Sequence, residues 1–391
     1  MITGAILTSL TGMNTYTDGL QNISNNVANL NSTGYKQTVQ SFANLVDDTS
    51  GSSTGSSQQN TGAGVHIGST LTDYSQGTLQ PTNNDLDLAL QGGGFIVVMD
   101  KNGAVSYSRT GSFAVDKDGY ISDQTTGERL AVLDANGQPV AINLNDKQTS
   151  APVATTKIVL NGNIAPGSTD AKVSNITVYD DHGIAHVWKI DFTPSTDTAN
   201  EWDAVVTDDQ GNPVGNATVD FTATVANPAS STSTITYTPS GAGQMSVTLD
   251  FSQVTSSGSA TNVQTASVDG SVAGTLSNVT IDSNGQIQLN YSNQQTVADG
   301  AVALANFRNP QLLTRLSNGL YRNLTGELAS LGSSGKEGFG TLTPKSIEAS
   351  NVDLSSAFGD LILLQRGFQA CSEVISVSND MIQQLFAIRG Q

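Results

Sequence analysis

The stretch LSSAFGDLILLQRGFQACSEVISVSNDMIQQL, residues 354–385, carries a repeating apolar pattern that predicts one long helix. From Leu361 onward, apolar or small side chains recur at alternating spacings of three and four residues, which is the period of a coiled-coil-like seam. A helix from about Asp353 to Ile388 would be roughly 50 Å long. Ser350 or Asn351 is placed to cap its start. The predicted seam consists of Leu354, Phe358, Leu361, Leu364, Phe368, Cys371, Ile375, Ser378, Ile382 and Leu385.

A second pattern of the same kind runs through residues 1–46. Asp18 and Lys36 are the only charged residues in this stretch, and from Met13 onward the apolar spacings again alternate between three and four. The segment is therefore predicted to be an amphipathic helix with a matching seam. The members of this seam are Ile2, Ile6, Leu10, Met13, Tyr16, Leu20, Ile23, Val27 and Leu30.

The opposite faces of both predicted helices carry Ser, Thr, Asn and Gln in place of Lys and Glu. A free-standing helix normally shows charged residues and ion pairs there, so both helices are expected to be covered. Each glycine costs about 1 kcal/mol of helix propensity relative to Ala, which predicts helices that order only against other copies. Pairing of the two helices within one chain is an equally open alternative. The glycines are Gly4, Gly12, Gly19, Gly359 and Gly367.

Between the two ends, the pattern changes to that of antiparallel β-structure. Repeated four-residue segments have Asp first and Gly fourth, as a type I turn continued by a left-handed Gly requires. Alternating runs, such as Phe95 to Val97, flank them. The turn segments are 100–103, 116–119, 134–137, 282–285 and, in looser form, 180–183 and 208–211. The sequence therefore predicts a mainly β chain with long terminal α-helices.

Changes in composition divide the chain into four predicted parts. The most distinctive internal part holds both tryptophans, Trp188 and Trp202, and is predicted to be one β-domain inserted into another. The parts are a terminal helical polymerisation domain (1–46 and 350–391), a Ser/Gly-rich connection (47–70), a discontinuous β-domain (71–150 and 271–349) and an inserted outer β-domain (151–270).

The charge balance excludes several classes of partner. With 16 Lys+Arg against 34 Asp+Glu, the net charge is -18, although only 13% of residues are charged. Nucleic acid or an anionic membrane would demand a basic patch, so neither is expected as a partner. Cys371, the single cysteine, allows no intramolecular disulfide. The N-terminus lacks the features of a cleaved leader, and no membrane insertion is expected because no apolar run reaches about 20 residues.

Catalytic and metal-binding patterns are weak. His182 and His186 are four residues apart, a spacing at which two histidines can bind one metal ion on a helix. No third and fourth ligands are evident near them in the sequence. The segment 332–336 departs from a phosphate loop because Ser330 stands where the loop requires Gly. We therefore expect no enzyme activity, no cofactor and no metal site.

Two segments, at opposite ends of the chain, resemble the paired signatures of the bacterial flagellar rod and hook proteins. The N-terminal segment is 24–36, with the sequence SNNVANLNSTGYK, and the C-terminal segments are 350–354 and 365–370. The matching residues are Asn25, Asn26, Ala28, Asn29, Thr33, Gly34, Tyr35 and Lys36 in the first, and Ser350, Asn351, Val352, Asp353, Leu354, Gln365 and Arg366 in the second. The family usually has Asn where Cys371 stands here.

This resemblance implies a fold and a function. It covers about the first 150 and last 120 residues, and the extra module of 151–270 favours a hook subunit over a distal-rod subunit. The implied protein self-assembles through its terminal helices into a curved tubular filament, a flexible joint that transmits torque from rod to propeller filament.

The resemblance also implies partners and a location. These are other copies of the chain, the flagellar rod, the hook cap, the hook-filament junction proteins and the flagellar type III export apparatus, with the assembled protein outside the cell. The rivals are another axial protein of the same family and, from a different class, a secreted acidic β-rich adhesin, which would not explain the paired signatures.

Overall fold

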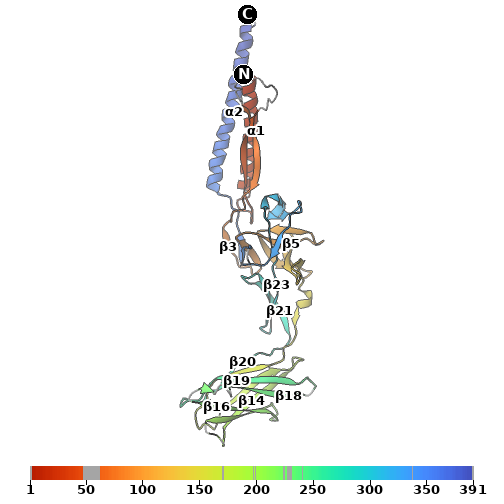
Figure 1. The fold of residues 1–391 in the computed structure, drawn as a ribbon, viewed down its shortest axis with the longest axis vertical. Helices are drawn as coiled ribbons and strands as arrows, with labels where there is room; N and C mark the ends of the chain where they lie inside the picture. Colours follow the sequence, from red (N-terminus) through yellow and green to blue (C-terminus); the bar gives the residue numbers. More distant parts are fainter. Residues whose placement is uncertain are drawn as a thin grey trace, which may run out of the picture. The chain divides into compact units, whose positions relative to one another are not determined.

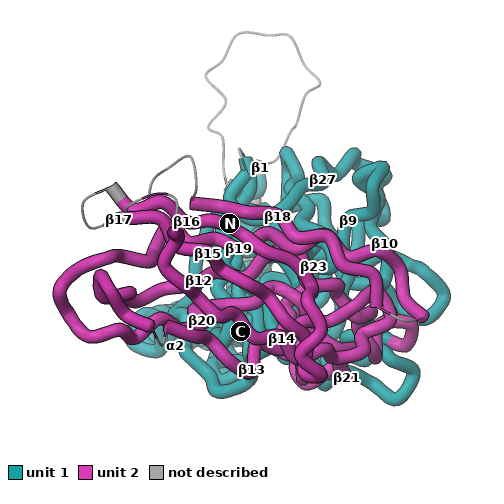
Figure 2. Tube along the Cα trace, turned by 90° about the horizontal axis from the view of Figure 1, so that it is seen from below, with its two compact units in different colours: residues 1–144, 280–288, 298–391 teal, residues 145–279, 289–297 magenta. Residues whose placement is uncertain are grey.

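The computed structural model describes residues 2–46, 62–169, 171–196, 198, 200–222, 225–226, 231–239, 241–336 and 338–389. The chain forms two compact units, drawn in different colours in Figure 2. Unit 1 comprises residues 1–144, 280–288 and 298–391, and unit 2 comprises residues 145–279 and 289–297. The predicted inserted domain, 151–270, falls inside unit 2.

Unit 1 contains two terminal helices, α1 (Ile2–Ala28) and α2 (Leu354–Arg389), which run antiparallel beside each other (Figure 1). An antiparallel hairpin of strands β1 (Thr38–Val46) and β2 (Gly62–Thr72) packs against α1. We call these four elements the shaft. The pairing of both helices within one chain, which the sequence left open, is thus present in the structure.

The N-terminal helical segment is shorter than the sequence pattern predicts. Helix α1 ends at Ala28, and Thr38–Val46 is a strand although a helical domain was expected through residue 46. In this stretch β-branched and aromatic residues are frequent, and its backbone pairs along its length with β2, which outweighs the helical spacing. The expected connection of 47–70 likewise contains strand from Gly62 onward, while its residues 47–61 lie outside the described part of the chain.

The remainder of unit 1 is built on a twelve-stranded sheet whose main order is β25-β26-β6-β5-β9-β8-β7-β4-β28, with β10, β24 and β27 attached to it. Its neighbouring strands all pair antiparallel. Its strands are β4 (Asp87–Gln91), β5 (Phe95–Met99), β6 (Val105–Ser108), β7 (Thr110–Val115), β8 (Ile121–Asp123), β9 (Arg129–Leu133), β10 (Pro139–Ala141), β24 (Leu304–Asn306), β25 (Thr314–Arg315), β26 (Tyr321–Arg322), β27 (Ser330–Gly332) and β28 (Thr341–Pro344).

Two further strands lie next to this sheet in the chain and matter for the site. Strands β3 (Leu79–Pro81) and β29 (Ser346–Glu348) pair antiparallel, and β29 leads directly toward α2. Short 3-10 helices, η2 (Pro310–Leu312) and η3 (Ser317–Gly319), flank β25. The aromatic part of the core brings Phe95 together with Phe307 and Tyr321.

Unit 2 contains a nine-stranded sheet of order β13-β14-β15-β16-β17-β19-β12-β20, with β18 paired to β19. Its pairs are antiparallel except β12 with β19, which is parallel. The strands are β12 (Lys157–Asn163), β13 (Ala171–Tyr179), β14 (Ala185–Pro194), β15 (Glu201–Thr207), β16 (Pro213–Thr222), β17 (Val225–Ala226), β18 (Thr232–Tyr237), β19 (Met245–Thr255) and β20 (Gln264–Val268). Trp188, Trp202 and Phe251 are buried in its core.

Four short strands make a separate sheet of order β11-β21-β22-β23. They are β11 (Thr149–Ser150), β21 (Gly274–Ile281), β22 (Gln286–Tyr291) and β23 (Thr296–Ala301), and a 3-10 helix, η1 (Asn145–Lys147), precedes them. Among the described residues, no helix has the length and hydropathy that crossing a membrane takes.

The six predicted turns have the expected geometry. In each, the Gly N–H donates to the Asp carbonyl oxygen at 2.9 to 3.1 Å, and the Gly has φ between 75° and 86°. The Asp side chain also accepts backbone N–H groups, as Asp100 does from Asn102 and Ala104. This donation, above all from Ala104, lowers the pKa of Asp100.

Candidate functional site

The two predicted seams face each other across the helix pair, but only part of them is covered within one chain. Leu361, Leu364 and Phe368 are half-buried, and Ile23 is buried. The other predicted assembly residues that are at least half-buried are Ile6, Met13, Leu20, Val27, Leu30, Cys371, Ile375 and Ile382. Those that remain exposed are Leu10, Leu354, Phe358 and Leu385.

Three of the five helix glycines mark close contacts of the helices. A Cβ added at Gly12 would lie 2.9 Å from Cys371 Sγ, and one at Gly367 would lie 2.6 Å from the Tyr16 ring. At Gly19 the close neighbour is Leu364 Cδ1, at 2.9 Å. These glycines therefore allow the helices to approach, so their low helix propensity is only part of their role.

The β1–β2 hairpin covers another side of α1. The Tyr16 and Phe42 rings lie 6.1 Å apart, and Thr15 Oγ1 donates to the Val65 carbonyl at 3.2 Å. The side-chain amides of Asn22 and Asn26 both donate to the carbonyl oxygen of one hairpin residue, at 2.8 and 2.9 Å. The Asn residues near the end of α1 thus fasten the hairpin to the helix.

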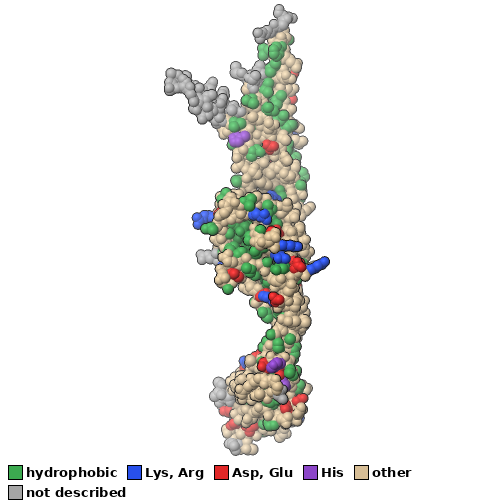
Figure 3. All heavy atoms as spheres, turned by 90° about the vertical axis from the view of Figure 1, so that its right-hand side faces the viewer, with side chains coloured by type: hydrophobic (Ala, Val, Ile, Leu, Met, Phe, Trp, Pro, Cys, Tyr) green, Lys and Arg blue, Asp and Glu red, His purple; other side chains and the backbone are tan. Residues whose placement is uncertain are grey.

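Helix α2 also presents apolar side chains that a single copy of the chain leaves exposed. Leu363 is 69% exposed, and further apolar residues follow it toward the end of the helix, where the space-filling view shows hydrophobic side chains along the shaft (Figure 3). We call these residues the outer face of α2: Ile362, Leu363, Val374, Val377, Met381, Phe386 and Ile388. The sequence pattern predicted Ser, Thr, Asn and Gln on the side of each helix opposite its seam, and it did not identify these apolar residues.

The second candidate feature is a buried charge cluster below the shaft, which we call the junction. Lys36 Nζ lies 2.7 Å from Glu348 Oε1, and both side chains are 0% exposed. Glu348 Oε1 also accepts from Gln76 Nε2 at 2.9 Å and from the Gly77 N–H at 2.7 Å, while Lys36 donates to the Ser75 carbonyl at 2.6 Å. Burial lowers the pKa of Lys36, and the hydrogen bond to Glu348 opposes that effect.

Arg109, which lies between strands β6 and β7, completes the junction. Its Nε lies 3.6 Å from Glu348 Oε2, and its Nη1 donates to the Gly94 carbonyl at 2.6 Å. Glu348 N–H in turn donates to Thr110 Oγ1 at 3.0 Å. The cluster therefore links the N-terminal signature, the β-sheet and the strand before α2, and such a pair holds a geometry because unpairing either charge is costly.

Asn351 ties the two signatures together. Its Oδ1 accepts from the Gln37 N–H at 2.8 Å, and its Nδ2 donates to the carbonyl oxygens of Asp73 and Ser75 at 2.9 and 3.2 Å. Its own backbone N–H donates to the Tyr35 carbonyl at 3.3 Å. A side chain with both donors and an acceptor is required at this position.

The loop after α1 is shaped by the other N-terminal signature residues. Asn26 Oδ1 accepts from the Tyr35 hydroxyl at 3.1 Å and from the Thr38 N–H at 3.0 Å. Gly34 has φ 68°, and its N–H donates to the Glu348 carbonyl at 2.7 Å. A Cβ at Gly34 would lie 2.8 Å from Thr110 Cγ2, so the position requires Gly on two counts. Asn29 N–H and side-chain amide both donate to the Asn25 carbonyl.

The remaining signature residues have other placements. Asp353 caps α2, because its Oδ1 accepts from the Ser355 N–H at 2.8 Å. The expected caps therefore have different roles: Ser350 Oγ accepts from the Val352 N–H, and Asn351 belongs to the junction. Exposed positions are Ala28, Thr33, Leu354, Gln365 and Arg366, whereas Val352 is buried.

The junction residues Glu348, Arg109 and Gln76 were not identified as site residues from sequence. One signal was available, since Lys36 is one of only two charges in residues 1–46, and a lone charge that becomes buried calls for a counter-ion. Which carboxylate supplies it depends on the pairing of β29 with β3, which no local pattern reveals.

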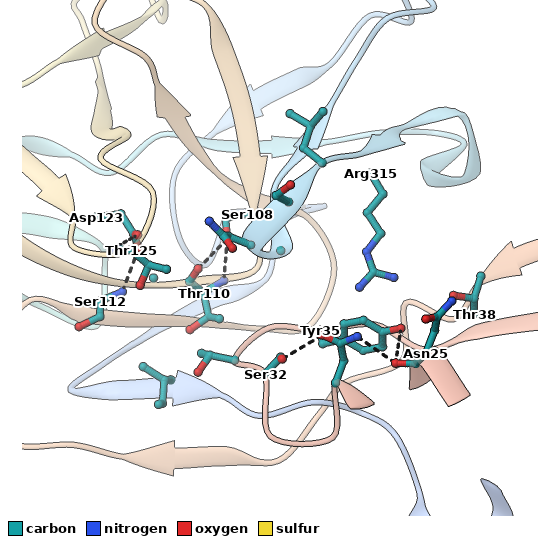
Figure 4. A pocket seen from close by; sticks show the side chains of 18 of the residues that line it. Asn25, Ser32, Tyr35, Thr38, Ser108, Thr110, Ser112, Asp123, Thr125 and Arg315 are labelled. Atoms are coloured by element: carbon teal, nitrogen blue, oxygen red, sulfur yellow. Dashed lines mark hydrogen bonds between the residues drawn. The ribbon is translucent and has the colours of Figure 1, made fainter. Parts of the chain in front are cut away.

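A polar cavity of about 610 Å³ lies beside the junction, between the end of α1 and the β-sheet (Figure 4). Arg315 lies over the Tyr35 ring, with its guanidinium carbon 4.0 Å from the ring centre, and donates to the Lys36 carbonyl at 3.1 Å. On the opposite wall, Ser112 donates its hydroxyl to Asp87 and its N–H to Asp123. Among the described residues, these hydrogen bonds all lie within the protein and do not by themselves mark a ligand site.

The two histidines considered as metal ligands lie at a turn and on the following strand in unit 2. Asp180 Oδ1 accepts the N–H groups of His182 and Ile184, while its Oδ2 lies 3.1 Å from His186 Nε2. Within the described residues, Asp180, Asp181 and His182 form the one three-residue group close enough to share an ion. The turn already uses the Asp180 carboxylate, so the group is explained by the hairpin.

Comparison with known proteins gives consistent results along the chain. Residues 343–388 match the C-terminal model of flagellar basal body rod FlgEFG proteins, residues 89–165 match the D1 domain of flagellar hook protein FlgE/F/G, and residues 143–303 match the D2 domain of flagellar basal body protein FlaE. These matches include both helix α2 and the β-units.

Full-length relatives carry one name. Flagellar hook protein FlgE of Salmonella typhimurium (strain LT2) is 29% identical over 97% of this chain and 99% of its own length, and that of Rhizobium meliloti is 28% identical over 99% of both. A crystal structure of Helicobacter pylori flagellar hook protein FlgE2 aligns with 69% of this chain and 100% of its own, at 14% identity and a TM-score of 0.46. Three family domains in order and full-length relatives lead to one assignment: the chain belongs to the flagellar hook protein family.

Proposed function

We propose that this chain is the structural subunit of a bacterial flagellar hook and that copies of it polymerise through the shaft. The observation that carries the proposal is the outer face of α2, where Leu363, Phe386 and Ile388 are 69%, 70% and 75% exposed. Apolar surface on this scale normally marks an interaction site. Full-length relatives named flagellar hook protein support the identity of the polymer.

In the proposed polymer, the terminal helices of many copies form an inner tube, and their contacts cover the outer face. Head-to-tail contacts that do not close generate a helical filament. The filament acts as a flexible joint that transmits torque from the rod to the propeller filament. This role is structural, so it needs neither a catalytic step nor a cofactor.

The proposal extends to a pathway and to partners. The subunit leaves the cell through the flagellar type III export apparatus, adds beneath a hook cap and contacts the rod and the hook-filament junction proteins at the two ends. Cys371, the single cysteine of the chain, is unpaired, which suits passage in an unfolded state because no disulfide must form first.

Electron microscopy of the concentrated full chain tests the proposal. Curved tubes are expected from the native sequence, and the variant Val374→Gln/Val377→Gln is expected to give few or none because it makes the outer face polar. The matched control is Ile184→Gln, which replaces an apolar residue in unit 2 that is more exposed (57%) than Val374 (44%) or Val377 (46%), and it should leave the tubes intact. Tubes of normal yield from the outer-face variant, or none from the native chain, would contradict the proposal.

A further inference from the structure

The end of α2 extends beyond the start of α1. Gly19 contacts Leu364 and Gly12 contacts Cys371, which fixes the antiparallel register of the pair. Continuing this register along both helices places the first residues of α1 opposite about residue 381 of α2. The last turns of α2 therefore have no α1 residue beside them, and the C-terminal end of the ribbon projects past the N-terminal end (Figure 1).

Residues 382–388 of these last turns carry no charge, and four of them are large and apolar. We call Ile382, Leu385, Phe386 and Ile388 the tip; together they line a shallow apolar hollow. Leu385 is 55% exposed, and Phe386 and Ile388 are more so. Nothing in the described part of unit 1 covers these three side chains. Burying their apolar area against another surface would be favourable, so the area favours association.

A complementary concave surface lies at the other end of the helix pair. It is a groove of about 330 Å³ between α1, β1 and the first turns of α2. Its apolar lining includes Ile23, Val39, Phe42, Leu363 and Leu364, and Val39 and Phe42 are 53% and 45% exposed. A groove of this volume is large enough to receive one or two apolar side chains.

We propose that the groove of one copy receives the tip of a second copy. This inference rests on the proposed hook function and names the contact through which the polymer grows. Tip and groove are separated by roughly 35 Å of helix, so a copy cannot fill its own groove. Each contact between two copies leaves one free tip and one free groove, which is the heterologous, non-closing arrangement that extends a filament.

The chemistry of the groove favours this occupant. Asp360 is the one charged residue among those that line it, and residues 382–388 of the tip carry no charge. A basic partner peptide would find a single carboxylate there, whereas an apolar helix end brings no charge of its own that the groove would have to pair. The helical repeat of the tip also presents Leu385 and Ile388 on one side.

Cysteine pairing between two differently marked full-length chains tests the contact. In a Cys371→Ala background, one chain carries Phe386→Cys and the other Val39→Cys, and the two are mixed under polymerising conditions with mild oxidant. We expect covalent dimers in the mixture but not with either chain alone, and a ladder of oligomers from a chain with both substitutions. The matched control replaces Val39→Cys by Ile184→Cys, on an exposed strand-side position of unit 2, and should give no dimers.

The outcomes separate the inference from the proposed function. Tubes without tip-to-groove dimers, or dimers of Phe386→Cys chains alone, would overturn the tip-to-groove contact and leave the hook function standing. Absence of tubes from the native chain would overturn both. Should the cysteine chains fail to polymerise, Phe386→Gln and Phe386→Leu decide the question. If the contact exists, the critical concentration for polymerisation should rise at least tenfold for Phe386→Gln and change little for Phe386→Leu. Equal critical concentrations for the two variants would overturn the contact.

Discussion

The shaft and unit 2 place their large apolar side chains in opposite ways. In unit 2, Trp188, Phe192 and Phe251 are enclosed almost completely by the nine-stranded sheet. In the shaft, helix α2 covers one seam against α1 and leaves Leu363, Phe386 and Ile388 in solvent. Unit 2 therefore encloses its apolar core within a single copy, whereas the shaft leaves apolar surface that the proposed function assigns to contacts with further copies. This contrast separates stability of the subunit from assembly of the polymer.

The largest expected difference in stability is between truncating a buried side chain of unit 2 and truncating an exposed side chain of the shaft. Trp188→Ala should destabilise unit 2 by about 3–5 kcal/mol, because it leaves a cavity in a closed core. Leu363→Ala, at an exposed position, should change the stability of the monomer by less than about 0.5 kcal/mol. Denaturant unfolding followed by Trp202 fluorescence measures the first, and circular dichroism of the helices measures the second. Similar losses of stability for Trp188→Ala and Leu363→Ala would contradict the difference between the closed core of unit 2 and the exposed side chains of the shaft.

The junction should behave like a core although it is made of charges. Lys36→Met should cost about 3 kcal/mol, because it leaves Glu348 with only the longer contact to Arg109 as its cation while Gln76 and Gly77 still donate to it. Adding Glu348→Gln should recover only part of that loss, since it removes the under-compensated carboxylate but leaves the buried Arg109 without its anion. Chemical denaturation of the two variants is the measurement. A Lys36→Met variant as stable as the native chain would show that the ion pair is not needed to hold the junction.

Two glycines of α2 should respond in opposite directions to the same substitution. Gly367→Ala should destabilise the helix pair by about 1–3 kcal/mol, because its Cβ would meet the Tyr16 ring. Gly359→Ala has nothing within 4 Å of the new Cβ and should gain up to about 1 kcal/mol of helix propensity. Thermal unfolding followed by the circular dichroism of the helices compares the stability of the two variants. A gain at both positions would mean that the close helix approach is absent in solution.

The smallest expected effect is the contribution of one ion pair to the pH dependence of unit 2. The hydrogen bond from Lys157 lowers the pKa of Asp250 from its ordinary value to about 2. The folded-state pKa is depressed, so the stabilisation is present above the unfolded value of 3.8 and is lost as the pH falls toward 2. Because Lys157 is half-exposed, we expect about 1 kcal/mol. Asp250→Asn should flatten this part of the pH profile of tryptophan-detected unfolding, and an unchanged profile would exclude the pair as its cause.

The terminal helices and the turns could be predicted from sequence because their signals are local. The period of residues 354–385 predicts α2 nearly to its ends, and the Asp-to-Gly turns have the predicted geometry. The end of α1 at Ala28 could not be predicted in this way, because Thr38–Val46 becomes a strand only when β2 pairs with it.

The candidate site was only partly accessible to sequence reasoning. The seams could be predicted from periodicity, and the signature residues were identified by resemblance. The resemblance assigned no physical role to Gly34 or Asn351. Those roles depend on Thr110, Asp73 and Glu348, which lie far away in the sequence. The tip and groove depend on the register of α1 against α2, which the two separate patterns do not specify.

Hydrogen exchange of the full chain, compared between monomer and polymer, tests most directly the claim that other copies complete the shaft. The account predicts weak protection of residues 354–389 in the monomer, a large gain on polymerisation, and little change in the nine-stranded sheet of unit 2. Strong protection of these residues in the monomer with no gain in the polymer would contradict it, because the helices would then form a finished intramolecular core.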